Sequence, residues 1–489
     1  MRDVIMVFDV GTSSVKNTAV DVKTGELVAL KSKTYPTVIP QEGYMELNPE
    51  DIWNAAQDAC EALISEIRDS CHIHAISFSW FADDMLLVDE GKNPLTNIML
   101  FFDSRAKETF EYFLKKNPAE ICKKAGRGYS VNCEPMKVLW TKQNLPRTFE
   151  KAAYMFDNQQ YIFSRLGLDP VNDDSMALFK CVEDVRNRVW AKDILDLYEI
   201  PETMCSGKIV SCCDIVGRTD HFGRVELPCE IPVFAGAHDE LCGILGLGVL
   251  PGNGPIISDM MGTSNTINFL ADVTGQEASC EGNMPIRTAF ATYDNYGRGF
   301  PILGGALEWY ARTYCRGMQA EGLFSRLFEA VEFDGKSNLL MVPWFGKHKV
   351  GIRGITSATT PDDFFRALIE GLCYECSYSM QYNDDLMLKV RGEHIGLVRV
   401  GGGGSQSDKW LQLRASMYGI PVQKTITPQA CSVGAAVIAA CGLGMYTDFE
   451  AASKHMVSLG KVFEPDPVQR EAYMRKEPTF KAFHDMIMG

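Results

Sequence analysis

Two segments of the chain share one outline: an apolar strand that carries an aspartate, a tight glycine turn rich in hydroxyl groups, and a second strand. The first is FDVGTSSVKNTAV at residues 8–20, and the second is SDMMGTSNTINFL at residues 258–270. Each pattern predicts a β-hairpin, because alternating apolar residues flank a short turn that contains glycine. One such hairpin in each half of the chain indicates two domains of related architecture.

The length of the chain agrees with this division. At 489 residues it exceeds the size that one hydrophobic core usually supports, and two domains of about 200 to 250 residues are expected. The dense cluster of glycine and proline between the hairpins is LPGNG at residues 250–254. We therefore predict an N-terminal domain over residues 1–250 and a C-terminal domain over residues 251–489.

Strands and helices alternate in both halves, which indicates an α/β architecture. Residues 4–33 predict a three-stranded antiparallel meander, and Asn48 followed by Pro49 then marks the start of an amphipathic helix. In the second half, Thr360 stands before Pro361 and two aspartates, which is the pattern of another helix start.

The composition and charge of the chain argue against nucleic-acid and membrane partners. The formal net charge is −15, and no basic stripe offsets it, so a nucleic-acid partner is not expected. No apolar stretch approaches the ~20 residues that span a bilayer, and the first residues lack the pattern of a signal peptide. We therefore expect a cytoplasmic protein with no membrane partner.

The 16 cysteines are scattered through apolar segments, which indicates reduced core residues in a protein without a secretion signal. Cys373 and Cys376 have the CxxC spacing, but they lie in a helical pattern with no second pair and no nearby histidine. Helix packing is therefore favoured over redox or metal chemistry for this pair.

The two hairpin turns offer hydrogen-bond donors to an anion. Gly11 and Gly262 can adopt positive φ without steric cost, so each turn can present successive backbone N–H groups on one side. Hydroxyl donors are added by Thr12, Ser13 and Ser14 in the first turn and by Thr263 and Ser264 in the second. A single turn of this kind is common, but one per domain favours two phosphate clamps that face each other across a cleft.

A third feature is RVGGGGSQSDKWLQLRASMYGIPV at residues 399–422, which predicts a strand, a glycine run and an amphipathic helix. Four glycines let a flat or anionic group approach the backbone closely and leave the helix N-terminus free to face it. The segment differs from a dinucleotide fingerprint, since Gln406 replaces the last glycine, and no GxxxxGK[ST] loop occurs. A dehydrogenase or a P-loop enzyme is thereby disfavoured.

A fourth feature is VFAGAHDELCGILGLG at residues 233–248, in which Asp239 stands between a short strand and a helix of small residues. A carboxylate in such apolar surroundings is costly unless it has a task or a partner. The alternative is that Asp239 caps the helix that follows it. The residues alone leave both interpretations open.

These motifs, in this order, resemble the FGGY family of carbohydrate kinases, which belong to the actin-like ATPase superfold. The resemblance runs from Asp9 to about Met445. FDVGTSSVK is similar to the first phosphate motif of the family. The other matching segments are GYMELNPEDIW (43–53), FFDSRAKE (101–108), AGAHDELCG (235–243), MMGTSNTI (260–267), GGGSQSDKW (402–410) and CSVGAAVIAACGLGMY (431–446).

The resemblance implies two ribonuclease-H-like domains, of the actin and hexokinase type, with a cleft between them in which ATP phosphorylates a sugar or polyol hydroxyl. Asp239 matches the general base of the family, and Asp9 matches the carboxylate that organises hydrated Mg²⁺. The implied phosphate contacts are Gly11, Thr12, Ser13, Lys16, Gly262, Thr263 and Ser264. The implied adenosine contacts are Gly402, Gly403, Gly404 and Ser405.

The sugar end follows the family pattern less closely. SFSWFADDMLLVD at residues 77–89 holds Ala82 and Asp83 where the xylulose and gluconate kinases of the family carry Met-His, and the Arg-Glu pair of glycerol kinases is missing. The expected substrate contacts are Trp80, Asp83, Asp84, Asp103, Arg105, His238 and Asp239. The adjacent acids Asp83 and Asp84 favour a neutral polyhydroxylated ligand over a sugar acid, with a solvated loop as the alternative.

We therefore expect an ATP-dependent kinase that phosphorylates a ketose or sugar alcohol in carbohydrate catabolism, with a pentulose such as D-xylulose as the first candidate. The alternatives are a kinase for rhamnulose, ribulose, erythritol, glycerol or gluconate, a non-catalytic sugar or nucleotide sensor, and an actin-like chaperone ATPase. The presence of Asp9 and Asp239 opposes a sensor, because a sensor has no use for a base. The sequence leaves a homodimer open.

Overall fold

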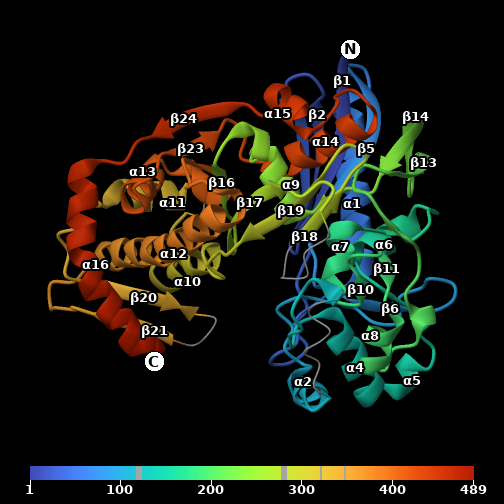
Figure 1. Cartoon of the computed structure of the whole chain (residues 1–489), viewed down its shortest axis with the longest axis horizontal. Helices are drawn as coiled ribbons and strands as arrows, with labels where there is room; N and C mark the ends of the chain where they lie inside the picture. The colour runs from blue at the N-terminus through green and yellow to red at the C-terminus, as the bar shows by residue number, and fades with distance from the viewer. Residues whose placement is uncertain (117–123, 277–283, 320–321, 346–348) are drawn as a thin grey trace. The chain divides into compact units, whose positions relative to one another are not determined.

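The computed structural model describes residues 1–116, 124–276, 284–319, 322–345 and 349–489, which form two compact units (Figure 1). Unit 1 comprises Met1–Gly246, Asp272–Asn295 and Cys431–Val457, and unit 2 comprises Leu247–Ala271, Tyr296–Ala430 and Ser458–Gly489. This division differs from a single boundary near residue 250, because two later segments return to unit 1.

Unit 1 is built on a seven-stranded sheet with the order β13-β14-β5-β1-β2-β3, in which β15 also pairs with β5. Its strands are β1 (Arg2–Val10), β2 (Ser14–Asp21), β3 (Leu27–Thr34), β5 (Cys71–Trp80), β13 (Ile215–Phe222), β14 (Val225–Phe234) and β15 (Ala237–His238). Strands β1, β2 and β3 form the predicted antiparallel meander, and β5 runs parallel to β1. Parallel β5 follows a helical crossover, as the α/β pattern predicts.

That crossover is α1 (Pro49–Ile67), which begins where the sequence predicts it. Asn48 caps the helix by accepting a hydrogen bond from the Glu50 N–H, and Pro49 occupies its first turn. A proline is tolerated there because its missing N–H would have no partner within the helix. The apolar face of α1 packs against β2, β3 and β14.

The C-terminal segment that rejoins unit 1 is α14 (Ala430–Gly442) followed by α15 (Phe449–Met456), drawn in red beside the blue strands in Figure 1. Ser432 Oγ lies 3.2 Å from Thr18 Oγ1, and Ser77 Oγ donates a hydrogen bond to the Ala435 carbonyl. A Cβ at Gly434 would lie 1.8 Å from the Cys242 carbonyl oxygen. The small residues of α14 therefore allow a close approach that makes it part of unit 1.

Shorter elements complete unit 1, and some of them surround a second core that includes Met85, Phe113, Met136 and Tyr198. These elements are β4 (Glu46–Leu47), β6 (Leu86–Val88), β7 (Ile98–Met99), α2 (Lys107–Leu114), α4 (Glu134–Asn144), α5 (Pro146–Phe149), β8 (Tyr154–Phe156), α6 (Asn158–Arg165), β9 (Asn172–Asp173), α7 (Asp174–Phe179), β10 (Glu183–Asp184), β11 (Val189–Trp190), α8 (Lys192–Leu197), β12 (Ile209–Val210), α9 (Asp239–Gly246), β18 (Met284–Arg287) and β19 (Thr292–Gly297).

Unit 2 repeats the central arrangement of unit 1 in its strands β17-β16-β22-β23-β24. Their bounds are β16 (Ile256–Met261), β17 (Asn265–Asp272), β22 (Leu397–Gly401), β23 (Val422–Thr425) and β24 (Leu459–Phe463). Strand β16 pairs antiparallel with β17 and parallel with β22, just as β1 pairs with β2 and β5. The two sequence hairpins are thus equivalent parts of two related sheets.

The helices and remaining strands of unit 2 are α10 (Gly304–Tyr314), α11 (Leu323–Ala330), β20 (Leu340–Trp344), β21 (Lys349–Arg353), α12 (Pro361–Arg391), α13 (Asp408–Tyr418) and α16 (Pro467–Met488). The predicted start of α12 is confirmed: Thr360 and Asp363 form a reciprocal capping box, and Pro361 is the first helical residue. The helix ends at Gly392, which adopts a left-handed conformation with φ of 72°.

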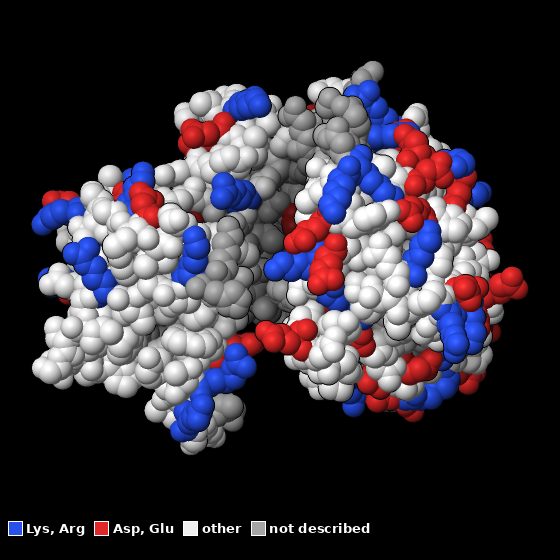
Figure 2. Space-filling view, turned by 90° about the horizontal axis from the view of Figure 1, so that it is seen from below, with Lys and Arg blue, Asp and Glu red and all other residues white. Residues whose placement is uncertain are grey.

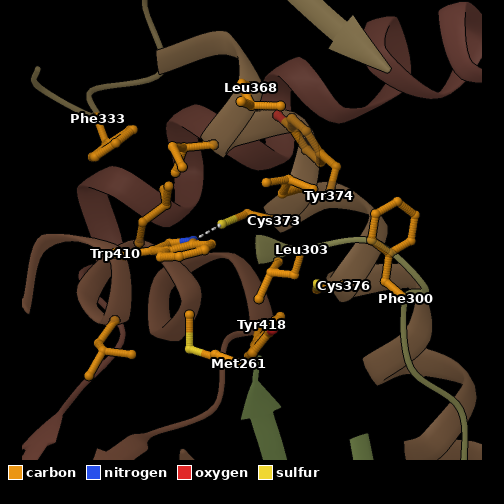
Figure 3. Close-up of a cluster of buried hydrophobic side chains, with 14 of the residues drawn as sticks. Met261, Phe300, Leu303, Phe333, Leu368, Cys373, Tyr374, Cys376, Trp410 and Tyr418 are labelled. Carbon is orange, nitrogen blue, oxygen red and sulfur yellow. Dashed lines mark hydrogen bonds between the residues drawn. The ribbon is translucent and has the colours of Figure 1, made fainter. Parts of the chain in front are cut away.

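Cys373 and Cys376 lie on the buried side of α12, as the packing interpretation predicts. Trp410 Nε1 donates a hydrogen bond to Cys373 Sγ at 3.2 Å, and Figure 3 shows both side chains within the apolar cluster. The Cys376 thiol lies 3.4 Å from Asn265 Oδ1. Burial raises the pKa of both thiols to about 12, so they stay protonated at neutral pH.

None of the described helices is long and apolar enough to cross a bilayer. On the face shown in Figure 2, lysine and arginine side chains lie among aspartates and glutamates rather than in a continuous basic stripe.

Candidate active site

Asp9 lies near the end of β1, directly before the first hydroxyl-rich turn. It is opposite Lys16 on β2 and Ser79 on β5, and Lys16 Nζ donates a hydrogen bond to its Oδ2 at 3.1 Å. Only 9% of Asp9 is exposed. The turn that follows it carries the predicted phosphate contacts Gly11, Thr12 and Ser13, all of them at least partly exposed.

The backbone of the two turns differs from the prediction. Neither Gly11 nor Gly262 adopts positive φ. Each N–H closes its own turn instead, donating to the carbonyl of Ser14 at 3.0 Å and of Ser264 at 3.1 Å, respectively. A Cβ at either glycine would make only ordinary contacts at 3.4 Å. Backbone strain therefore does not require glycine here, and these two N–H groups are not free to bind an anion.

Asp239 is placed beside Asp9 by the sheet. Strand β15 pairs with β5 so that Ala237 is opposite Ser79, which on its other side is opposite Asp9. Asp239 follows β15 as the first residue of α9. The ends of β1 and β15 therefore bring the two predicted catalytic carboxylates to the same edge of one sheet.

The electrostatics of Asp239 support this proximity. Although 45% of its side chain is exposed, desolvation by the surrounding protein and, secondly, the charge of Asp9 raise its pKa to about 7. Lys16 acts in the opposite direction on the same pKa, and the charges of Asp9 and Asp239 both raise the pKa of Lys16. These three side chains thus form one coupled charge cluster in unit 1.

His238 lies against Asp239 and is neutral. Its Nε2 is 3.2 Å from Asp239 Oδ1, and burial lowers its pKa to about 4. A neutral imidazole carries its hydrogen on one ring nitrogen, and the other nitrogen is an acceptor. Nδ1 is buried and has no hydrogen-bond partner within the part of the chain that the structure describes. Because Nδ1 has almost no exposed surface, a ligand hydroxyl does not reach it in this conformation.

A series of side-chain contacts connects His238 to Asp83. The His238 ring lies 4.5 Å from the Phe179 ring, and the guanidinium of Arg127 lies 4.1 Å above that same ring. Arg127 in turn forms a bidentate ion pair with Asp83, with distances of 2.7 and 2.6 Å. Arg127 was missed by the sequence analysis, because it belongs to no motif and only the fold brings it to Asp83.

Trp80 and Asp84 have no exposed surface, so the structure corrects their assignment as substrate contacts. Trp80 stacks on Phe78 at 4.4 Å and donates its Nε1–H to the Ala235 carbonyl. Asp84 accepts hydrogen bonds from the backbone N–H and the side-chain amide of Asn158 at 2.9 and 2.7 Å. Both residues hold the interior of unit 1 together.

Asp103 and Arg105 also form an internal ion pair rather than a ligand-facing one. The Asp103 side chain is fully buried and that of Arg105 is 3% exposed. Arg105 donates to both carboxylate oxygens of Asp103, at 2.8 and 2.7 Å, and to Glu46 Oε1 at 2.5 Å. Its guanidinium also lies 4.0 Å from the centre of the Tyr44 ring. Because these groups are already paired, the structure corrects the expectation that they contact a sugar directly.

In unit 2, the second hairpin turn and the glycine run both line a cavity of about 590 Å³. Its lining includes Gly262, Thr263, Gly403, Gly404 and Trp410. The volume lies within the range of about 300–1,000 Å³ that is usual for small-molecule sites. Four of the predicted nucleotide contacts are therefore brought together by the fold.

The glycines of the run have different surroundings. A Cβ at Gly403 would meet no atom within 4 Å, whereas a Cβ at Gly404 would lie 2.8 Å from Met261 Cβ. Gly402 adopts a φ of 83°, and Ser405 Oγ donates to its carbonyl at 2.7 Å. Ser405 is 3% exposed. Gly402 and Ser405 therefore shape the loop, and Gly403 leaves open space beside the cavity.

The aspartate of the second hairpin does not repeat the environment of Asp9. Asp259 is fully buried and forms an ion pair with Arg414, whose side chain is fully buried as well. Asn265 Nδ2 and Tyr418 Oη donate to the same carboxylate at 2.6 and 3.0 Å. Asp259 is thus a structural residue, and the two hairpins are alike in fold but not in chemistry.

Comparison with known sequences identifies the family. The sequence profile of the FGGY family of carbohydrate kinases, N-terminal domain, matches residues 4–246, and that of its C-terminal domain matches residues 296–443. The chain belongs to the FGGY family of carbohydrate kinases. The expected enzyme class is thereby confirmed.

Individual relatives agree with this assignment. The kinase is 26% identical to the xylulose kinase of Bacillus subtilis (strain 168), over 95% of this chain and 93% of that protein. It is 24% identical to the glycerol kinase of Enterococcus casseliflavus, with the same two coverages of 95% and 93%. The crystal structure of ligand-bound xylulose kinase from Lactobacillus acidophilus matches with a TM-score of 0.83 at 21% identity, covering 100% of this chain and 99% of that chain. The expected two-domain actin-like α/β fold is therefore confirmed.

Proposed function

We propose that this kinase transfers the γ-phosphoryl group of ATP to a hydroxyl of a neutral ketose or sugar alcohol, with a pentulose such as D-xylulose as the first candidate. The observation that carries the proposal is the charge cluster of Asp9, Lys16 and Asp239, in which Asp239 is half-exposed and lies beside the neutral His238. The xylulose kinase relatives support the choice of a pentulose.

Asp239 acts as the general base in this proposal. His238 Nε2 lies 3.2 Å from Oδ1 of Asp239, and the second carboxylate oxygen would accept the proton of the attacking hydroxyl. A positioned base of this kind typically contributes about 10²–10⁴-fold to the rate.

The cavity of unit 2 suits the nucleoside part of ATP. Apolar side chains such as Leu307 and Phe328 line it together with the open backbone at Gly403, which leaves room for a flat base. Thr263 in the same cavity and Thr12, Ser13 and Lys16 in unit 1 would contact phosphate oxygens. That the two hairpins act on one nucleotide stays a prediction.

The residues around Asp9 also fit a hydrated magnesium ion. Mg²⁺ prefers hard oxygen ligands, keeps several waters and is usually held by one or two carboxylates plus phosphate oxygens. Asp9 supplies such a carboxylate, and the pairing of β1 and β15 with β5 brings Asp239 to the same edge of the sheet. When bound, the ion would neutralise phosphate charge, which is the main requirement of phosphoryl transfer.

The Asp83–Arg127 pair favours a neutral polyol. The two side chains offer acceptors and donors next to each other, and their opposite charges balance. A sugar acid would in addition meet the carboxylate of Asp239, because Lys16 is already paired with Asp9. We therefore expect uncharged ketoses and polyols to be accepted in preference to gluconate.

The test is an ADP-release assay with Mg²⁺ and ATP across a panel of ketoses, polyols and sugar acids. The expected result is ADP release that rises on addition of an uncharged ketose or polyol. ADP release that no sugar increases would support an actin-like ATPase, and no turnover with any member of the panel would support a sensor. Either result would overturn the proposal.

A further inference from the structure

Two histidines and an aspartate meet at the end of the unit 1 sheet that lies away from the candidate active site. His72 and His74 are two residues apart on β5, where the pairing with β1 shifts by one residue, and their rings approach to 3.1 Å between Nδ1 and Nε2. Asp3 on β1 is the direct neighbour of His72 in the parallel register. Among the described residues, these three form the one group of three whose ligand atoms lie close enough to share a metal ion.

The size of the cluster matches a metal coordination site. His72 Nδ1 and His74 Nε2 are 3.1 Å apart, and Asp3 Oδ1 lies 2.9 Å from His74 Nε2 and 3.8 Å from His72 Nδ1. Zinc bound at about 2.0–2.2 Å from tetrahedral nitrogen and oxygen ligands separates those ligands by about 3.3–3.6 Å. The three separations lie on both sides of this ligand–ligand distance. Small side-chain rotations would therefore let all three atoms coordinate one ion.

Two close contacts of the cluster meet at a single nitrogen of His74. His74 Nε2 carries at most one hydrogen, yet it faces both His72 Nδ1 and Asp3 Oδ1. A cation at this point would be attracted by all three electron pairs at once. The nearby Lys23 approaches the other carboxylate oxygen, Oδ2, at 3.6 Å, and its side chain is 77% exposed. Lys23 therefore leaves Oδ1 accessible.

We propose that Asp3, His72 and His74 form a surface site for a transition-metal ion of the zinc type, with water in the fourth position. Two imidazoles and one carboxylate suit Zn²⁺, Co²⁺, Ni²⁺ and Cu²⁺ rather than Mg²⁺. The His72 and His74 side chains are 56% and 27% exposed, so an ion can enter from solvent. The bound ion links β1 to β5 near the N-terminus of the chain.

The site is separate from the catalytic residues. Asp3 and Asp9 lie six positions apart on β1, which corresponds to about 20 Å of extended strand. Metal binding here is therefore expected to stabilise the sheet of unit 1 without taking part in phosphoryl transfer. The proposed site should prefer Zn²⁺ to Mg²⁺, whereas phosphoryl transfer is expected to use Mg²⁺.

The test is titration of the EDTA-treated full-length chain with Zn²⁺ by calorimetry, and with Co²⁺ by visible absorption, in a buffer that contains Mg²⁺. We expect one site per chain whose Kd rises at least ~100-fold in the variant His72→Gln/His74→Gln, beyond the 10–100-fold typical of outer-shell changes. Zn²⁺ should also raise the melting temperature by about 2–4 °C in the native chain but not in this variant.

His221→Gln is the matched control, because His221 is an exposed strand histidine that pairs with a single carboxylate, Asp220. It should bind Zn²⁺ like the native chain. Circular dichroism of the double variant, whose substituted side chains lie at the surface, checks that it is folded. Zn²⁺ binding that is absent in the native chain, or unchanged in the folded double variant, would overturn the proposal.

Discussion

Three aspartates at strand ends show how one side chain serves different purposes. Asp259 is fully buried against Arg414, Asp9 is bound to Lys16, and Asp239 is half-exposed with a raised pKa. The chemistry of each follows from its neighbours rather than from its position in a motif. Three predictions at the scale of single residues follow from these environments.

Asp239→Asn is expected to lower kcat by at least ~10²-fold, because the amide cannot accept the proton of the attacking hydroxyl. Nucleotide affinity should stay nearly unchanged, since the predicted nucleoside contacts lie in unit 2. Steady-state kinetics and equilibrium binding of ATP check the two statements. Retention of most activity would show instead that Asp239 only caps α9.

The rate should depend on pH through the same carboxyl group. Its pKa of about 7 in the free enzyme means that the active, deprotonated form dominates above pH 7 and declines below it. We therefore expect kcat/KM to fall by about tenfold per pH unit below ~6.5. A profile of kcat/KM from pH 5 to 9 measures this dependence. A value of kcat/KM that stays constant below pH ~6.5 would contradict the assignment of Asp239 as the base.

Arg414→Met is expected to destabilise unit 2 by about 3–5 kcal/mol, because it leaves the Asp259 carboxylate buried without its partner. Chemical denaturation followed by tryptophan fluorescence measures the loss, since Trp410 lies 5.2 Å from Arg414. The double variant Asp259→Asn/Arg414→Met removes the buried charge and should recover part of the stability. Equal stability of the single variant and the native chain would refute the argument.

At the scale of elements, adjacent glycines of the run at residues 401–404 have different roles in the same loop. Strand β22 and helix α13 fix its two ends, and the short turn between them exposes Gly403 while Gly404 packs on Met261. Spacing in the sequence predicts that glycines are needed here, but not which of them borders the ligand.

Gly403→Ala is therefore expected to fold normally and to raise the KM for ATP by about 5- to 150-fold, equivalent to the 1–3 kcal/mol of an overpacked contact. Gly404→Ala should instead lower the melting temperature, since its Cβ would lie 2.8 Å from Met261 Cβ. Thermal unfolding and ATP kinetics of the two variants distinguish these effects. A destabilised Gly403→Ala with normal KM would contradict the assignment.

At the scale of the whole molecule, unit 1 is completed by a segment from far along the chain. Helix α14 supplies contacts to Thr18, Ser77 and Cys242, and residues 431–457 belong to unit 1 throughout. A single domain boundary near residue 250 therefore cannot assign residues 431–457 to unit 1.

A fragment of residues 1–250 is accordingly expected to lack a cooperative unfolding transition, because the apolar surface that α14 covers would be exposed to water. Appending residues 431–457 through a flexible linker should restore part of the transition. Calorimetry or circular dichroism on heating provides the measurement. A sharp transition in the short fragment would show that α14 is dispensable for the folding of unit 1.

The sequence alone determined the local elements and the family. The paired hairpins and the helix starts at Pro49 and Pro361 were predictable, because alternation and capping act over a few residues. Tertiary structure alone decided exposure and long-range pairing. It buried Trp80 and Asp84, paired Arg105 with Glu46 and brought Arg127 to Asp83. These outcomes depend on contacts between distant segments, and the identity of a residue does not specify its neighbours in space.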